Sequence, residues 1–359
     1  MLALRSGLAC QQELRQNGEV SSPGPLWRIA ACVPGSEANP MLEEKHMPLS
    51  ADLTTLALWA ALAALALLAW LSALGSPVLS ASAEILADVR SKVFYHKFAQ
   101  QMSKAGLIWL LVALLLTGLV MALRKAETSM LLSFLNEQPM LLLPLVIALA
   151  LLISFALLHA MTWRGLKESR GLHKLLGLLA ALASLASIWF ALSLCRLLAI
   201  LNRADPAIVI QDHFLIPATA PFWLLLGLVV MLALACASGL GLAYIVMRRN
   251  KDDWGRDYYG FALRLGAGWT LLSLGLQAGF LGWLASVHLL AGLALAADPI
   301  LRAGVIATAS ALLVAMLAYL FVWRSDTPLR HKPVIGLAVL LLLLMLAGLC
   351  LAGFQLLGL

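Results

Sequence analysis

The stretch MLLLPLVIALALLISFALLHAMTW, residues 140–163, decides the fold class of this chain. It contains no Lys, Arg, Asp or Glu, and Arg164 follows it at once. An apolar segment of about 18 residues or more is long enough to cross a bilayer as an α-helix. Alanine and leucine dominate the stretch without the period-two alternation of a β-barrel strand. The sequence therefore predicts a transmembrane helix here.

Seven further runs share this character, at residues 53–75, 105–123, 175–195, 221–247, 265–288, 303–323 and 333–357. Hydrophobic residues make up 62% of the 359-residue chain, and charged residues make up 12%. Soluble domains carry about 25% charged residues, roughly twice this fraction. The sequence therefore predicts an all-α integral membrane protein with eight transmembrane helices. Its net charge of +7 is then a property of the loops and does not indicate a nucleic-acid surface.

The cationic residues are unevenly distributed among the gaps between these runs. Of the 21 Lys and Arg residues after Met47, 16 fall in the first, third, fifth and seventh gaps. Short basic loops stay in the cytoplasm. We therefore expect these four gaps on the cytoplasmic side of a bacterial inner membrane, with both termini outside the cytoplasm.

Residues 1–46 differ from the rest of the chain, because they are polar and contain no sustained apolar run. The segment Glu43-Glu44-Lys45 before Met47 can be encoded by purine-rich codons that resemble a bacterial ribosome-binding site. Two interpretations stay open. Residues 1–46 are either an extension upstream of a true start at Met47 or a disordered tail.

Several landmarks recur in the same order in the two halves of the chain. Each half has a proline, a Trp-Arg pair 24 residues later and then a His-Lys pair: Pro139, Trp163-Arg164 and His173-Lys174, then Pro299, Trp323-Arg324 and His331-Lys332. Aromatic-rich segments, 94–99 and 257–262, also precede the second run of each half. The recurrence predicts a tandem parallel repeat of two four-helix bundles. Their predicted limits are 47–202 and 221–359, with an outer loop at 203–220.

Residues 84–98 have an amphipathic pattern, with apolar side chains on one side and Arg90 and Lys97 on the other. The pattern predicts a helix that lies along the cytoplasmic interface.

The run 265–288 contains Gly275 and Gly279 in a G-x-x-x-G pattern, which lets helix backbones approach closely. We expect close packing inside the bundle, with a homodimer contact as the lesser alternative. Gln277 lies between these glycines, and we expect its amide to bond a neighbouring helix.

Polar groups at membrane depth are costly, so each of them is a candidate site. A quinone head needs a polar partner and a proton path near a helix end, while its tail enters from lipid. An outer candidate cluster contains His288, Asp298, Arg302, Arg196 and His213, and an inner one contains Tyr95, His96, His159 and Tyr319. The outer cluster is preferred, although Asp298 and Arg302 are also well explained as the cap of a helix start.

A b-type haem needs axial ligands that face each other across a bundle. His159 and His173 are 14 residues apart, but charged residues intervene, so we expect them on different helices near one surface. His159 with His96 is the better pair, yet interfacial histidines are more often polar anchors. There is no C-x-x-C or C-x-x-C-H, and we predict no metal site.

Two four-helix units with both ends outside resemble the membrane-anchor subunits of polysulfide-reductase and dimethyl-sulfoxide-reductase type complexes. The resemblance, which is one of outline without a diagnostic motif, implies quinone binding and iron–sulfur or molybdoenzyme partner subunits. Cytochrome bd oxidase subunits are similar in their paired four-helix bundles, but residues 53–75 lack the haem-ligating histidine that their catalytic subunit needs. Haem A synthases also duplicate four helices, but with histidines at the outer ends, whereas His173 and His331 are expected at inner ends.

The sequence contains no Walker motif, H-E-x-x-H or G-x-S-x-G. Its architecture favours a quinone-interacting membrane subunit of a respiratory electron-transfer complex. A permease or lipid-handling protein and a b-type haem protein are the alternatives.

Overall fold

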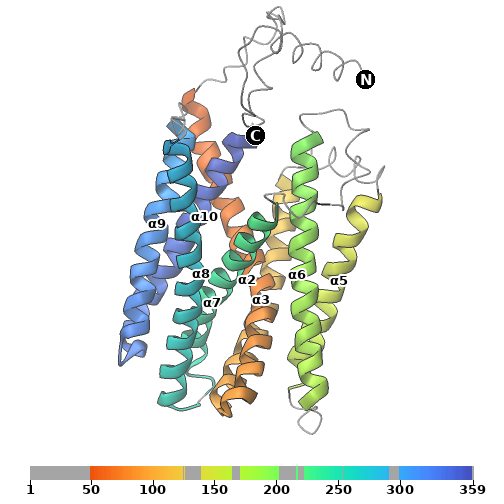
Figure 1. Cartoon of the computed structure of the whole chain (residues 1–359), viewed down its shortest axis with the longest axis vertical. Coiled ribbons are helices and arrows are strands. Elements are labelled where there is room, and N and C mark those ends of the chain that lie inside the picture. Colours follow the sequence, from red (N-terminus) through yellow and green to blue (C-terminus); the bar gives the residue numbers. More distant parts are fainter. Residues whose placement is uncertain are drawn as a thin grey trace, which may run out of the picture. The chain divides into compact units, whose positions relative to one another are not determined.

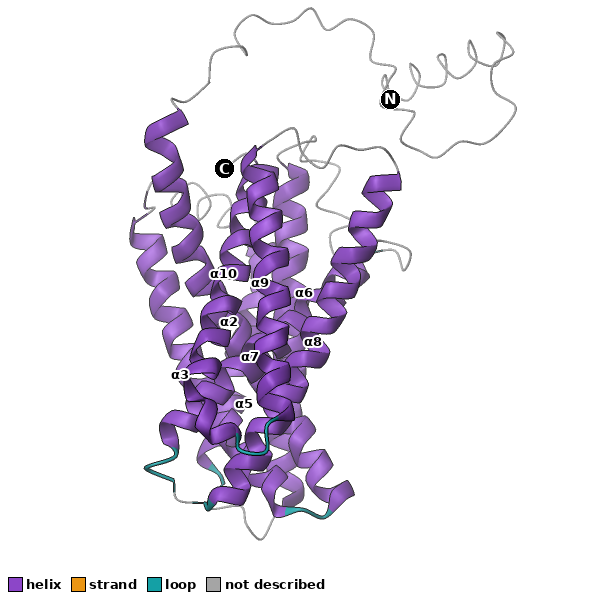
Figure 2. Cartoon of the chain, turned by 90° about the vertical axis from the view of Figure 1, so that its left-hand side faces the viewer, coloured by secondary structure: helices purple, strands orange, loops and turns teal. Residues whose placement is uncertain are grey.

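A computed structural model describes residues 49–123, 125, 139–163, 170–201, 216, 222–252, 254–290 and 299–357 of the chain. Within these residues the structure is all-helical (Figures 1 and 2). The long helices are α2 (Leu49–Arg90), α3 (Val93–Leu123), α5 (Pro139–Met161), α6 (Arg170–Leu201), α7 (Phe222–Arg248), α8 (Arg256–Leu290), α9 (Pro299–Arg324) and α10 (Lys332–Leu357). A short 3-10 helix, η4 (Pro328–His331), precedes α10.

Each of the eight apolar runs forms a helix, as predicted, and several helices extend beyond the run. Among the described residues, seven helices are long and apolar enough to cross a membrane. The helix outside this group is α8, which has Arg264 near its start and Gln277 among several glycines. The fold class is therefore that of an all-α membrane protein, while a membrane span in α8 stays a prediction.

The prediction of a separate interfacial helix at residues 84–98 is wrong. Helix α2 continues through Pro77 to Arg90, and α3 begins at Val93 after a tight turn. Ser91 in this turn has a φ of 51°. A proline inside a membrane helix is tolerated where neighbouring groups satisfy the freed backbone carbonyl. Glu84 therefore lies inside a long helix and is buried.

The helices from Thr55 to Leu359 form one compact body. Helix α7 connects its two halves, because it packs against α3 and α6, and Gly75 of α2 lies against its Ala233 carbonyl. The Tyr258 hydroxyl of α8 donates a 2.6 Å hydrogen bond to Gln101 Oε1 of α3. The two aromatic-rich segments matched in the sequence also touch, since the rings of Tyr95 and Phe261 meet edge to face at 4.9 Å. The tandem repeat and its limits stay predictions.

The expected tight packing at Gly275 and Gly279 is wrong. A Cβ added at either position would meet no atom of the described residues within 4 Å. Close helix contacts occur instead where α9 meets α10, since a Cβ at Gly304 would lie 2.9 Å from the Gly348 carbonyl oxygen. The prediction for Gln277 is confirmed, because its amide nitrogen donates to the Leu228 carbonyl of α7.

The helix ends joined by the connections α2–α3, α5–α6, α7–α8 and α9–α10 lie at one end of this body (Figure 1). These connections are the four gaps in which the cationic residues concentrate. Which side of a membrane this end faces stays a prediction. The tail at residues 1–46 and the loop at 203–220 lie outside the described residues.

Candidate functional site

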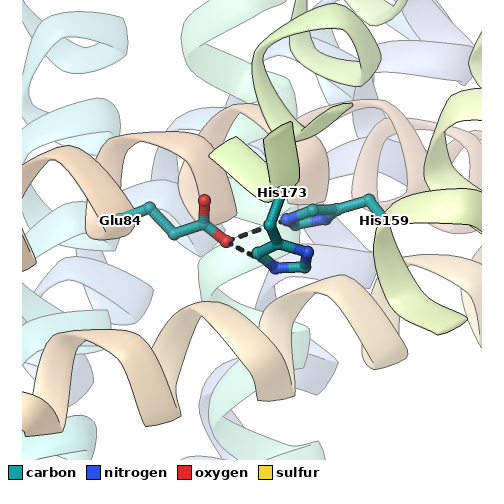
Figure 3. A group of neighbouring side chains, drawn as sticks. All are labelled: Glu84, His159 and His173. Atoms are coloured by element: carbon teal, nitrogen blue, oxygen red, sulfur yellow. Dashed lines mark hydrogen bonds and ion pairs between the residues drawn. The ribbon is translucent and has the colours of Figure 1, made fainter. Parts of the chain in front are cut away.

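Three buried ionisable side chains meet near the end where the basic connections lie (Figure 3). Glu84 comes from the last part of α2, His159 from the last turn of α5 and His173 from the first turn of α6. They are 2%, 2% and 8% exposed, respectively. The packing of α5 against α6 brings the two histidines together, and the continuation of α2 beyond Pro77 brings the carboxylate to them. We call these three residues the Glu–His–His centre.

Both histidines direct the same ring nitrogen toward one carboxylate oxygen. Glu84 Oε1 lies 2.8 Å from His159 Nε2 and 3.3 Å from His173 Nε2. The two imidazole rings stack, with centroids 4.5 Å apart and planes 25° apart. The Trp163 ring meets the His173 ring edge to face at 4.4 Å and closes the side of the stack.

The other ring nitrogens contact hydroxyl groups. His159 Nδ1 lies 3.2 Å from Ser103 Oγ of α3, and His173 Nδ1 lies 3.1 Å from Thr162 Oγ1. Each imidazole is therefore fixed at two atoms, by the carboxylate on one side and a hydroxyl on the other. Such double contacts set both the ring orientation and the position of the proton.

Some buried polar atoms of this centre and of the adjoining Trp163 have no hydrogen-bond partner among the described residues. They are Glu84 Oε2, His173 Nε2 and the indole nitrogen of Trp163. The 3.3 Å approach of His173 Nε2 to Glu84 Oε1 is an ion-pair distance without hydrogen-bond geometry. Buried polar groups are normally paired, so these unpaired atoms need an explanation.

Gly177 makes room for the centre. A Cβ at this position of α6 would lie 2.9 Å from His159 Nε2, the atom that contacts Glu84. Any larger residue would push the imidazole out of its place. Gly177, which follows the His173-Lys174 pair in the sequence, therefore has a steric function.

A pocket of about 280 Å³ adjoins the centre between α2 and α6. Its lining consists of Ala81, Glu84, Ile85, Gly171, Lys174, Leu175 and Leu178. The Lys174 ammonium forms an ion pair with the Asp88 carboxylate one helical turn beyond Glu84. The pocket is thus mostly apolar, with one cation and one carboxylate in its lining.

The structure separates the inner candidate residues of the sequence analysis. His159 belongs to the Glu–His–His centre, whereas Tyr319 is buried in α9, where its hydroxyl approaches Gly239 of α7. Tyr95 packs against Phe261, and His96 is half-buried in the first turn of α3. His159 therefore contacts Glu84 and His173, whereas Tyr319 lies elsewhere in the bundle.

The outer candidate residues are only partly described. Arg196 is half-buried in α6, and Arg302 is exposed in α9. His288 lies in α8, but its side chain is outside the described part, as are Asp298 and His213. An outer site stays a prediction.

The sequence analysis missed Glu84 as a site residue and set His173 aside. A signal for Glu84 was present, because Ser72, Ser76, Ser80 and Glu84 recur every four residues. This spacing places them along one face of a helix, and all four are buried. A polar stripe on a continuous helix would have indicated that position 84 points inward.

The two histidines do not fit a bis-histidine haem. Axial ligands lie on opposite faces of the porphyrin, whereas the rings of His159 and His173 stack directly on each other. Both Nε2 atoms also point to the same carboxylate oxygen. A porphyrin cannot enter between the rings unless they separate.

Comparison with known proteins gives a likeness of fold. No family model matches this chain, and no curated protein matches it in sequence. The solved structure of bd oxidase from Geobacillus thermodenitrificans is similar, with a TM-score of 0.56. The match covers 85% of this chain and 86% of that chain at 14% sequence identity. The arrangement of helices in this protein is therefore similar to that of a chain of this bd oxidase.

Proposed function

We propose that this protein is a quinone-interacting membrane subunit of a respiratory electron-transfer complex. The observation that carries the proposal is the apolar pocket between α2 and α6, which has the Lys174–Asp88 ion pair beside it. A quinone needs this combination, because its tail requires an apolar route and its head requires a donor and a proton acceptor.

The lining side chains suit a ligand that enters from lipid. Ile85, Leu175 and Leu178 line the pocket and are 56%, 49% and 45% exposed on the surface of the helices. In a membrane such exposed apolar side chains face lipid tails. An isoprenoid tail can therefore leave the pocket across these residues without burying a polar group.

The ion pair suits the head group. The Lys174 ammonium can donate a hydrogen bond to a quinone carbonyl, and the Asp88 carboxylate can accept the proton of a quinol hydroxyl. The Asp88 side chain is 52% exposed, so a proton that it accepts can continue to water. This arrangement provides binding and proton release at one place.

The likeness of fold to bd oxidase supports the respiratory context of the proposal. An electron-transfer subunit of this kind works with partners, for which the iron–sulfur or molybdoenzyme subunits expected from the sequence remain the proposed class. Gly279 is exposed on α8 and Gly275 is half-exposed, so a second copy of the chain remains a further proposed partner for that helix face.

Quinone content of the purified protein tests the proposal. We expect the detergent-solubilised wild type to retain quinone on extraction and to bind decylubiquinol. Loss of a hydrogen bond from a charged donor costs about 1.5–3 kcal/mol, so Lys174→Met should bind roughly tenfold or more weakly. Lys332→Met is the matched control, because Lys332 occupies the corresponding His-Lys pair and is exposed.

Wild-type protein that neither retains quinone nor binds decylubiquinol would overturn the proposal. Equal binding by the Lys174→Met and Lys332→Met variants would remove this pocket as the site. Solute flux in liposomes by a quinone-free protein would favour the permease alternative.

A further inference from the structure

The proton positions in the Glu–His–His centre follow from the hydroxyl of Thr162. This hydroxyl lies 2.7 Å from the Leu158 carbonyl oxygen, the ordinary acceptor of a threonine at that spacing in a helix. The hydroxyl therefore donates its single proton to this carbonyl. Thr162 Oγ1 in turn accepts a hydrogen bond from His173 Nδ1 at 3.1 Å. Neutral His173 therefore has a lone pair on Nε2.

That lone pair points at a carboxylate. His173 Nε2 lies 3.3 Å from Glu84 Oε1, and neither His173 Nε2 nor Glu84 Oε2 has a hydrogen-bond partner in the described part of the chain. Two electron-rich atoms that face each other in a buried site repel, because little water screens them. The arrangement is stable only if a positive charge lies between them.

We propose that Glu84, His159 and His173 bind a divalent transition-metal cation. The proposal stands on these three side chains and their unpartnered atoms, and does not rest on the proposed quinone function. One oxygen and two nitrogens, all within 4.8 Å of one another, converge from three different helices. A cation at this point joins α2, α5 and α6.

The ligand separations suit such a cation. Metal–ligand distances of about 2.0–2.2 Å place neighbouring ligands about 2.8–3.1 Å apart in octahedral geometry and about 3.3–3.6 Å apart in tetrahedral geometry. The separations from Glu84 Oε1 are 2.8 Å to His159 Nε2 and 3.3 Å to His173 Nε2. The unpartnered Glu84 Oε2 can complete a bidentate carboxylate.

The surroundings present the correct nitrogen of each ring. In a metal-bound state His159 Nδ1 donates to Ser103 Oγ and His173 Nδ1 donates to Thr162 Oγ1, which leaves both Nε2 atoms free to ligate. Metal-binding histidines regularly have such an outer acceptor. Two imidazoles and one carboxylate favour Zn²⁺, Fe²⁺, Co²⁺ or Mn²⁺ over Mg²⁺ or Ca²⁺, which prefer oxygen ligands.

The competing explanation is an additional proton. Protonated His173 would form an imidazolium–carboxylate pair with Glu84 and would also relieve the repulsion. The two explanations differ in one observable, because a proton leaves no metal content and no saturable affinity for Co²⁺.

Metal analysis of the detergent-solubilised protein, purified on a tag without histidine, tests the proposal. After treatment with a chelator, Co²⁺ is titrated and followed by its visible absorption, and Zn²⁺ is titrated by calorimetry. We expect one equivalent to bind per wild-type chain. Glu84→Gln and His173→Gln should weaken binding more than a hundredfold, and Ser103→Ala should weaken it about 10- to 100-fold because it removes only an outer partner.

His331→Gln is the matched control. His331 occupies the corresponding His-Lys pair of the second half, where its ring meets Phe321 edge to face, and its loss should leave the stoichiometry at one. Ser103→Ala keeps all three ligands and remains informative if the ligand variants do not fold. Wild type that binds neither Co²⁺ nor Zn²⁺ at 1:1 stoichiometry overturns the proposal, as does unchanged affinity in folded Glu84→Gln and His173→Gln or in Ser103→Ala.

Discussion

The substitution Gly177→Ala tests the steric basis of the Glu–His–His centre. The new Cβ would lie 2.9 Å from His159 Nε2, whereas ordinary van der Waals contact begins at 3.4 Å. The ring must therefore retreat by about 0.5 Å, because helix packing limits movement of the Cβ. His159 is held at 2.8 Å by Glu84 and at 3.2 Å by Ser103, so at least one of these contacts must lengthen.

The expected change in stability follows from two opposing effects. Loss of one buried hydrogen bond to a charged group costs about 1.5–3 kcal/mol. Replacing a helical glycine by alanine raises the free energy of unfolding by about 1 kcal/mol, because alanine has the higher helix propensity. We therefore expect Gly177→Ala to lower the free energy of unfolding by about 0.5–2 kcal/mol.

Gly336→Ala is the matched control. Gly336 follows the second His-Lys pair, and a Cβ there would meet no described atom within 4 Å. Only the propensity gain applies, so this variant should be unchanged or more stable by up to about 1 kcal/mol. Apparent melting temperatures in one detergent, in the presence of a chelator, compare the two variants, and each kcal/mol corresponds to roughly 1–2 °C for a chain of this length. If Gly177→Ala melts at or above Gly336→Ala, the steric argument fails.

Two further predictions concern the contact between the halves. Gly75→Ala should lower the free energy of unfolding by about 1–3 kcal/mol, because its Cβ would overlap the Ala233 backbone carbonyl, while Gly118→Ala has free space and should not. Thermal melts of the two variants check this, and equal melting temperatures would contradict the close approach of α2 and α7. Burial raises the pKa of Tyr258, which donates to Gln101, so this phenol stays protonated in the folded protein above the usual value of about 10. Stability from this group is therefore complete below pH 10 and decreases as the pH rises further. In melts recorded from pH 8 to 11, Tyr258→Phe should be less stable at pH 8 and should lose less stability with pH than wild type, and parallel curves would contradict the assignment.

The helices could be predicted from the sequence because their formation is a local property. A long apolar run such as 140–163 satisfies its backbone only as a helix in lipid, and charged residues such as Arg164 interrupt it. The eight helices followed from this pattern, as did the bond from Gln277 to a neighbouring helix. The pattern misled at residues 84–98, because α2 continues through Pro77 to Arg90.

The Glu–His–His centre depended on tertiary structure. Each residue turns a helix by about 100°, so the direction of a side chain relative to its neighbours depends on how whole helices rotate and cross. Glu84 precedes His159 by 75 residues, the three side chains lie on three helices, and nothing local specifies that they face one point. For the same reason the G-x-x-x-G pattern at Gly275 and Gly279 did not show whether another helix packs against these glycines. The length of each apolar segment can be read directly from the sequence. The contact of three polar side chains depends on how the helices pack against one another.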